Sequence, residues 1–180
     1  MLAMLREGMS EHSITNIEAI QSRWPMPAPP RASIALISHV AYDIEEVVPF
    51  LDAMEASAEE LCVAVLLAEA PASVAAPFWP AVHGERRALL PALPEFLVLQ
   101  VARARPCEVR LFERPGGVYE SPEAPLRFLR QQLWVQEGSE KDAKLRAELE
   151  RLQQKVEGGF SFRPVAVPLG VVTWRPGVTY

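Results

Sequence analysis

The stretch ASIALISHVAYDIEEVVPFLDAM, from Ala32 to Met54, decides the fold class that this sequence predicts. It begins with a near-continuous apolar run, Ala32 to Val40, which is typical of a strand covered on both faces, as in parallel sheets. A polar cluster, Ser38 to Asp43, follows, and the residues after it form one apolar face at helical spacing. This order of strand, polar turn and helix is typical of a ligand site in an open α/β sheet.

The start of the helix in this stretch has two alternatives. Asp43 is a favourable N-cap, and Glu46 three residues later completes a pattern like a capping box. Pro49 is comfortable only in the first turn of a helix, which favours a start nearer Val48. Asp43 is therefore interpreted either as a helix cap or as a residue of the ligand site.

A second apolar run, Leu61 to Leu67, predicts a second buried strand. Two strands joined by a helix form a βαβ unit, which should be right-handed and parallel. Ligands of such sheets lie beyond the carboxyl ends of the strands. The cluster from Ser38 to Asp43 occupies such an end.

The remaining elements follow from hydrophobic spacing, prolines and glycines. Ser139 is the predicted cap of the clearest helix, whose apolar face we expect to pack on the sheet rather than to form a coiled coil. The predictions are helices over residues 1–10, 95–104, 122–135 and 139–156, strands over 17–23, 107–114 and 163–174, proline-rich loops over 25–30 and 70–94, and a turn at Gly116-Gly117.

Composition narrows the class of protein. The chain has 180 residues, 49% of them hydrophobic, which is enough for one domain with a real core. Its net charge of −5 and the lack of a long basic run argue against a general nucleic-acid binder. The longest apolar run, Leu61 to Ala68, is too short to span a bilayer, and the start has no secretory signal. We therefore expect a cytoplasmic protein with no membrane partner.

Cysteines and histidines give no metal signature. Cys62 and Cys107 lie inside predicted strands, so buried thiols are favoured over a disulfide or a reactive thiol. The three histidines are scattered, and neither a C-x-x-C nor an H-E-x-x-H motif is present. No metal site is predicted.

Several segments, in order, resemble class I S-adenosylmethionine-dependent methyltransferases. SHVAYDIEEVVPFLDAM, from Ser38 to Met54, is similar to their fourth strand and the helix after it. The other similar segments are AMLREGMSEHSITNIEAIQSRW (second helix, third strand and the R-W after it), LCVAVLLAEAP (fifth strand), WPAVHGERRALLPALPEFLVL (the insert before the next helix in one bacterial branch) and VAVPLGVVTWRP (closing strand). The resemblance covers nearly the whole chain and implies S-adenosylmethionine as cofactor.

The sequence departs from that family at the cofactor. Family members carry a first strand ending in a glycine-rich loop and a second strand ending in an acid that holds the ribose, and neither is found here. We therefore expect the C-terminal portion of a methyltransferase, which binds S-adenosylmethionine weakly or not at all. Residues 17–23 would lack a neighbouring strand, and the strand from Ala32 would have an exposed apolar edge open to self-association.

The resemblance also implies roles for particular residues, each with a structural alternative. Arg23 and Trp24 would lie near the adenine, or cover the rim of the core. Ser38 and His39 would lie near the methionine end of the cofactor, where a histidine can orient an acceptor or take a proton. Tyr42 and Asp43 would line the acceptor pocket. In the proline-rich insert, Trp79 and His83 would cover that pocket. No catalytic residue follows from spacing, because methyl transfer depends mainly on positioning.

The sequence thus predicts an α/β fold: a partial Rossmann-like methyltransferase sheet, mostly parallel with an antiparallel closing strand, and with helices on both faces. We expect one partial domain over residues 1–180: a second helix and third-strand region over 1–31, a central βαβ unit over 32–70, the insert and a helix over 71–105, and C-terminal strands and helices over 106–180. Two functions stay open: methyl transfer to an unidentified acceptor, incomplete in this chain, or a non-catalytic interaction module derived from a methyltransferase.

Overall fold

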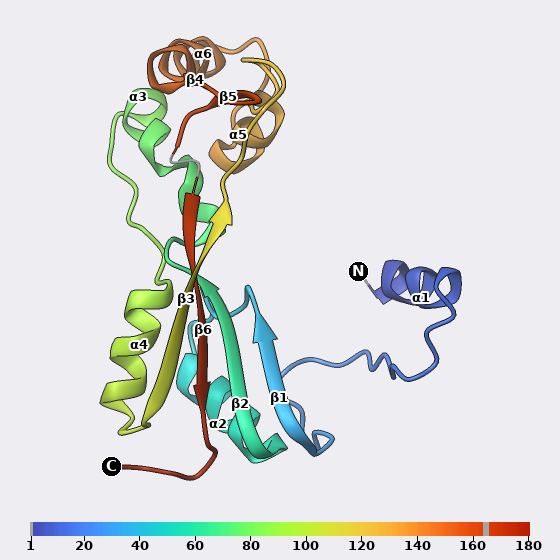
Figure 1. The fold of residues 1–180 in the computed structure, drawn as a ribbon. Helices are drawn as coiled ribbons and strands as arrows, with labels where there is room; N and C mark the ends of the chain where they lie inside the picture. The colour runs from blue at the N-terminus through green and yellow to red at the C-terminus, as the bar shows by residue number, and fades with distance from the viewer. Residues whose placement is uncertain (1, 164–165) are drawn as a thin grey trace.

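The computed structural model describes residues 2–163 and 166–180. A four-stranded sheet with the order β1-β2-β6-β3 forms one end of the molecule, and a group of helices with a small two-stranded sheet forms the other (Figure 1). Each end has its own hydrophobic core. Helix α1, Leu2–Glu11, stands apart from both ends and contributes no buried residue.

The central unit is β1 (Ala32–Ser38), α2 (Val47–Ser57) and β2 (Ala58–Leu67). Strands β1 and β2 pair in parallel, with Leu36 opposite Val63. The predicted βαβ unit is therefore confirmed. Helix α2 begins close to the predicted Val48, with Pro49 in its first turn.

The other half of the sheet comes from the end of the chain. Strand β6, Ala166–Trp174, pairs antiparallel with β2 on one side and with β3, Cys107–Pro115, on the other. Strands β1, β2 and β3 therefore point the same way, and only the closing strand is reversed. The antiparallel direction of the closing strand is as predicted. The expected start of the last strand at residue 163 is too early, and residues 164–165 lie outside the described part of the chain.

Only one face of the sheet is covered by helices, among the residues that the structure describes. Helix α2 and helix α4, Leu93–Ala102, pack on this face around Cys62, Ala64 and Trp174. The fit is close at Gly170 in β6, because a Cβ there would come within 2.5 Å of the Leu93 side chain in α4.

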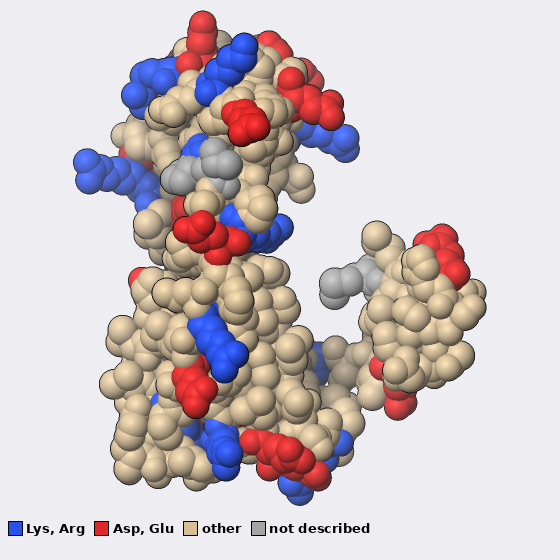
Figure 2. All heavy atoms as spheres, in the orientation of Figure 1, with Lys and Arg blue, Asp and Glu red and all other residues tan. Residues whose placement is uncertain are grey.

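The opposite face of the sheet is uncovered, so the prediction of helices on both faces is wrong. Ile34 and Leu36 of β1 are 54% and 61% exposed, and Phe112 of β3 is 52% exposed. Figure 2, which views this face, shows it as largely uncharged over β1 and β2. The apolar run of β1 is typical of a strand buried on both sides, but the described residues place no helix on one of them.

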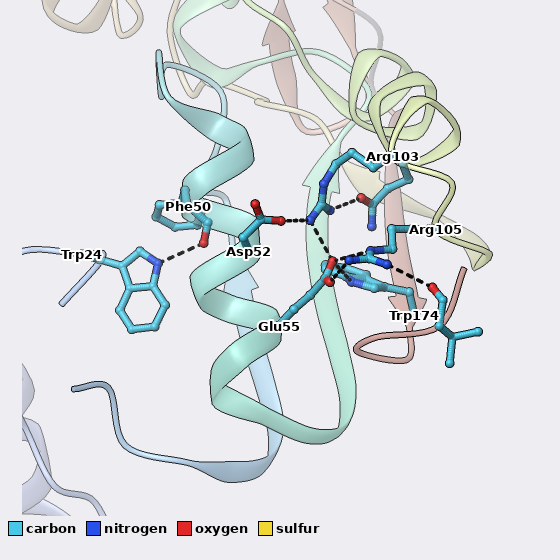
Figure 3. Close-up of polar contacts among 9 residues, drawn as sticks. Trp24, Phe50, Asp52, Glu55, Arg103, Arg105 and Trp174 are labelled. Carbon is cyan, nitrogen blue, oxygen red and sulfur yellow. Dashed lines mark hydrogen bonds and ion pairs between the residues drawn. The ribbon is translucent and has the colours of Figure 1, made fainter. Parts of the chain in front are cut away.

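A buried ion cluster joins α2, α4 and the end of β6 (Figure 3). Glu55, 7% exposed, accepts hydrogen bonds from Arg103 at 2.9 Å, from Arg105 at 3.2 Å and from the Trp174 indole at 3.1 Å. Asp52 accepts from Arg103 at 2.6 Å. Because β2 starts and β6 ends here, the cluster lies at the end of the sheet opposite the carboxyl ends of β1 and β2, where it holds the helices to the sheet.

The helical end is built from segments that the sequence places far apart. Its second core contains Phe78, Trp79, Leu129, Leu145 and Leu149. The elements are the 3₁₀ helix η1 (Pro71–Phe78), α3 (Trp79–His83), α5 (Leu126–Leu133), α6 (Glu140–Leu152), β4 (Gln154–Val156) and β5 (Gly159–Ser161).

Helix α6 is capped as predicted but packed differently. The Ser139 hydroxyl accepts a hydrogen bond from the Asp142 amide at 3.2 Å. Its apolar residues, Leu145 and Leu149, lie in the core of the helical end. The prediction that this helix packs on the sheet is therefore wrong, because η1, α3 and α5 supply a second apolar surface that the spacing along α6 alone does not indicate.

The segment between α1 and β1 contains no strand in the described structure. The strand predicted over residues 17–23 is therefore wrong. A strand needs a partner for its backbone hydrogen bonds, and within the described structure residues 17–23 pair with neither edge strand, β1 or β3. Ile17 and Ile20 are 42% and 45% exposed.

Candidate functional site

The carboxyl ends of β1, β2 and β3 meet at the edge of the sheet that faces the helical end of the molecule (Figure 1). Two cavities lie there, one on each side of the residues that follow β1. This is the position where an open α/β sheet binds ligands. It is also the position that the sequence predicts for the cluster from Ser38 to Asp43.

The turn after β1 has an unusual backbone. His39 and Ala41 have φ angles of 56° and 79°, in the left-handed region that residues other than glycine rarely adopt. The His39 amide donates to the Val65 carbonyl at 2.9 Å, which keeps the turn against β2. Such strain is concentrated at functional sites in proteins. The turn is therefore a candidate site on its geometry as well as on its position.

Tyr42 lies between the two cavities and is 7% exposed. Its hydroxyl accepts a hydrogen bond from the Leu67 amide at 2.8 Å and lies 3.4 Å from Nδ1 of His39. A hydroxyl that accepts from Leu67 can still donate its own hydrogen to an unprotonated Nδ1 of His39 or accept from a protonated one. Burial raises the pKa of Tyr42. The neutral phenol thus connects the turn after β1 to the end of β2.

The first cavity, of about 420 Å³, lies on the helix-covered face, between the turn and α4. Tyr42 and Asp43 line it together with Leu66, Phe96 and Leu99. Asp43 does not cap α2: Glu46 occupies the N-cap position, and no side chain bonds the cap. The prediction of Asp43 as a helix cap is therefore wrong, because the helix begins further along, near Pro49.

The second cavity, of about 550 Å³, lies between the sheet and the helical end. It is lined by two guanidinium groups, Arg114 and Arg163, by His39, Gln132 and Tyr119, and by apolar side chains including Leu67, Val74 and Phe128. No Asp or Glu is among the described residues that line it. In a chain of net charge −5, this is a local concentration of positive charge.

The two arginines of the second cavity differ in their partners. Arg163 contacts Glu69 at 3.4 Å, and its buried Nε has no hydrogen-bond partner among the described residues. Arg114 is exposed and has no carboxylate partner in the part of the chain that the structure describes. Burial raises the pKa of Tyr119, while the nearby Arg163 lowers it. The cavity therefore has unused capacity to donate hydrogen bonds.

Ser38 and His39 stand at this edge in different ways. Ser38 pairs with Val65 in the sheet and is exposed on the uncovered face. His39 lines the second cavity. Of the residues for which the resemblance implies a site, the structure thus brings together His39, Tyr42 and Asp43, with Ser38 at the rim.

Arg23 and Trp24 lie elsewhere. The Trp24 indole donates to the Phe50 carbonyl on α2 at 3.3 Å, and the two rings meet edge to face at 6.1 Å (Figure 3). Arg23 is exposed. Neither lines either cavity at the carboxyl edge. These contacts match the structural alternative, in which Trp24 covers the rim of the core.

Trp79 belongs to the core of the helical end, and the partly buried His83 lies against it. Their rings lie 4.3 Å apart, and Nε2 of His83 donates to the Leu133 carbonyl at 3.0 Å. Lys141 donates to the other ring nitrogen at 3.1 Å. Arg87 lies 4.7 Å above the Trp79 ring. The two residues connect α3 to α5 and α6, and neither lines either carboxyl-edge cavity.

The cysteines are free thiols, as predicted, and Cys62 is buried while Cys107 is partly buried. Burial raises the pKa of Cys62 to about 11, with Glu55 adding to the effect. The described residues contain no group of three or more His, Cys, Asp or Glu side chains that could hold a metal ion. Within the described ranges, no helix has the length and apolar character needed to cross a membrane.

Comparison with known proteins adds no family: no protein-family model matches the chain, and no curated protein sequence matches it.

Arg114 and Arg163 are site residues that sequence reasoning missed. Arg114 lies at the end of a predicted strand of alternating apolar and polar residues, and Arg163 lies at the start of the last predicted strand. In the sequence alone, each is therefore interpreted as an ordinary solvent-exposed charge. A weak signal exists at Gly116-Gly117, two small residues next to Arg114 that also line the cavity. Glycine pairs allow close approach of a ligand to the backbone, but such pairs also occur in simple turns.

Proposed function

We propose that this chain forms the acceptor side of an S-adenosylmethionine-dependent methyl-transfer site. The observation that supports the proposal is the turn after β1, where His39 and Tyr42 lie in contact and each lines a cavity. In the resemblance to class I methyltransferases, this turn passes the methionine end of the cofactor and the acceptor. The methyl acceptor itself is unidentified.

Methyl transfer from S-adenosylmethionine requires little direct chemistry from protein side chains. The methyl group of a sulfonium is already activated, so catalysis depends on holding the acceptor in line and on excluding water. His39 would orient an acceptor or take its proton, since Nδ1 lies near the Tyr42 hydroxyl and the residue lines the second cavity. Tyr42 would act as a positioning residue, because its hydroxyl is already bonded to Leu67.

The chain should bind the cofactor weakly. The sequence has no glycine-rich loop of the kind that holds the methionine end of the cofactor, and no acid at the end of a second strand for the ribose. Each hydrogen bond to a charged group contributes roughly 1.5–3 kcal/mol. Two or three missing bonds therefore weaken binding on the order of 100-fold or more.

Titration with S-adenosylhomocysteine, followed by amide NMR, tests this proposal. We expect weak, millimolar binding with shifts concentrated at residues 38–43, and weaker binding in His39→Ala with an unchanged melting temperature, because the His39 side chain is exposed. The Trp24 indole signal tests the adenine role implied for Arg23 and Trp24. Shifts only outside residues 38–43, or tight micromolar binding, would show that the cofactor site is misplaced.

A second candidate function is a non-catalytic interaction module. The uncovered sheet face and the unpaired edge of β1 support it, because exposed apolar strands without charged or proline residues are sites of pairing. This function predicts association of the chain with itself and no response to S-adenosylhomocysteine. The two measurements together separate the candidates.

A further inference from the structure

The second cavity has the features of a binding site for an anion. Its described lining holds Arg114, Arg163 and His39 and no acidic side chain. Charged donors that line a concave, partly apolar surface bind oxyanions, because guanidinium groups present several N–H donors in a fixed plane. Because the described lining holds no acidic side chain, the donors of Arg114 stay available, and Glu69 outside the lining contacts only Nη2 of Arg163.

The donors are not used up by the protein. Arg163 contacts Glu69 through Nη2 at 3.4 Å, and its Nη1 makes no hydrogen bond to any residue that the structure describes. The described residues therefore leave the Nη1 donors available to a ligand oxygen. Arg114 enters the same cavity from the end of β3, without a carboxylate partner in the described ranges.

The balance of charge favours a single negative charge on the ligand. Glu69 offsets part of the charge of Arg163, so the two arginines and this carboxylate together leave about one net positive charge at neutral pH. A monoanion matches that charge, whereas a phosphate dianion exceeds it.

The rest of the lining favours an apolar body on the ligand. Leu67, Val74, Phe128 and Val167 form an apolar wall, and Phe128 of α5 is 37% exposed. An inorganic ion would leave this wall in contact with water. An apolar or aromatic group would cover it, with a gain of about 25 cal/mol for each Å² removed from water.

We propose that this cavity binds an apolar carboxylate, with the carboxylate group held between Arg114 and Arg163 and the hydrocarbon portion placed against Leu67, Val74 and Phe128. The cavity would bind such a ligand whether or not the chain takes part in methyl transfer. Gln132 and the Tyr119 hydroxyl, which also line the cavity, are further groups able to bond polar atoms of the ligand.

Titration of the full chain with phenylbutyrate, hexanoate and indoleacetate, followed by amide NMR, tests the proposal. We expect saturable shifts at residues 114–119, 128 and 132 with at least one of the three probes. Phenylbutyramide, which keeps the apolar body and removes the charge, should bind at least about tenfold more weakly than phenylbutyrate, as should inorganic phosphate. Binding should weaken as salt is added, because exposed charges are screened.

Substitutions of the two cavity arginines test where the carboxylate group binds. Arg114→Gln should weaken phenylbutyrate binding about tenfold or more, and Arg163→Gln should do so as well. The control is Arg110→Gln, which removes an exposed arginine from the same strand and the same face outside the cavity, and it should leave binding unchanged. Because Arg114 and Arg110 are both exposed, neither change should unfold the chain.

Four results would overturn the proposal. The first is the absence of saturable binding of all three carboxylates at millimolar concentration. The second is equal binding of phenylbutyramide, which would exclude recognition of the charge. The third is equal binding of phosphate, which would exclude a role for the apolar wall. The fourth is equal loss of binding in Arg110→Gln and Arg114→Gln, which would show a general charge effect.

Discussion

At the scale of single residues, Tyr42 shows how one side chain serves both the fold and the candidate site. The resemblance implies a role in the acceptor pocket, and the ring does line the first cavity. Its hydroxyl also accepts from the buried Leu67 amide, a contact between residues on successive strand ends that the sequence does not indicate. Tyr42 therefore supports the fold as well as lining the cavity.

Tyr42→Phe should lower the free energy of unfolding by about 1–3 kcal/mol, because the Leu67 amide loses its acceptor inside the protein. Urea denaturation measures this loss. Tyr180→Phe is the matched control, since Tyr180 is 80% exposed and the same atom is removed. Equal stability of wild type and Tyr42→Phe would show that the bond to Leu67 contributes nothing to folding.

At the scale of elements, the connection between α5 and α6 depends on one carboxylate. Asp142, 2% exposed, accepts hydrogen bonds from Arg130 at 2.8 and 2.9 Å and from the Gly138 amide at 2.9 Å. The bonds from Arg130, followed by the Gly138 amide and Arg146, hold the pKa of Asp142 well below its ordinary value, against the opposing effect of burial. The ionised form is therefore favoured in the folded state.

This shift predicts a dependence of stability on pH. A carboxylate whose pKa is lowered on folding contributes stability that is complete above its ordinary pKa of 3.8 and is lost as pH decreases toward the folded pKa. We expect urea denaturation of the wild type to show decreasing stability below about pH 4. Asp142→Asn should be less stable at neutral pH and should lose less on acidification.

The control for this prediction is Glu150→Gln, which removes an exposed carboxylate from the same helix. It should follow the pH dependence of the wild type. The comparison runs from pH 7 to pH 3, which is about one unit below the ordinary pKa of Asp. If Asp142→Asn and the wild type lose the same stability over this range, the hydrogen bonds of Asp142 do not control the acid sensitivity of the helical end.

At the scale of the whole molecule, the main feature is the unequal cover of the sheet. Two helices pack on one face, and the other face exposes Ile34 and Leu36 next to the free edge of β1 (Figure 1). Edge strands usually carry a charge, a proline or a bulge that prevents pairing. Strand β1, ASIALIS, has no charged residue and no proline, and its register irregularity lies at its start, between Ala32 and Ile34, away from Leu36. Association through this face and edge is the expected consequence.

Leu36→Lys should therefore reduce self-association, measured by sedimentation at increasing protein concentration, without lowering the melting temperature, because Leu36 is 61% exposed in the isolated chain. The matched control is Val101→Lys, an apolar residue with 66% exposure on α4, which should leave association unchanged. A wild-type chain that stays monomeric at high concentration, or equal effects of the two variants, would contradict the role of the uncovered face.

The sequence by itself determined the strands of the large sheet, the parallel pairing of β1 with β2, and the positions of most helices. Apolar runs such as Ala32 to Val40 and the cap at Ser139 are local patterns that specify the backbone directly. They also placed His39, Tyr42 and Asp43 at the carboxyl edge of the sheet, because the residues that end a strand are fixed by the strand.

Only the tertiary structure decided what comes together across the chain. Arg114 and Arg163 share a cavity, and Glu55 meets Arg103 and Arg105, although no spacing in the sequence relates them. Residues 17–23 alternate between apolar and polar side chains as a strand does. No described strand pairs with them, so they do not form a strand. The physical reason is that packing and charge pairing depend on distances in space, and these are set by which surfaces the other elements cover.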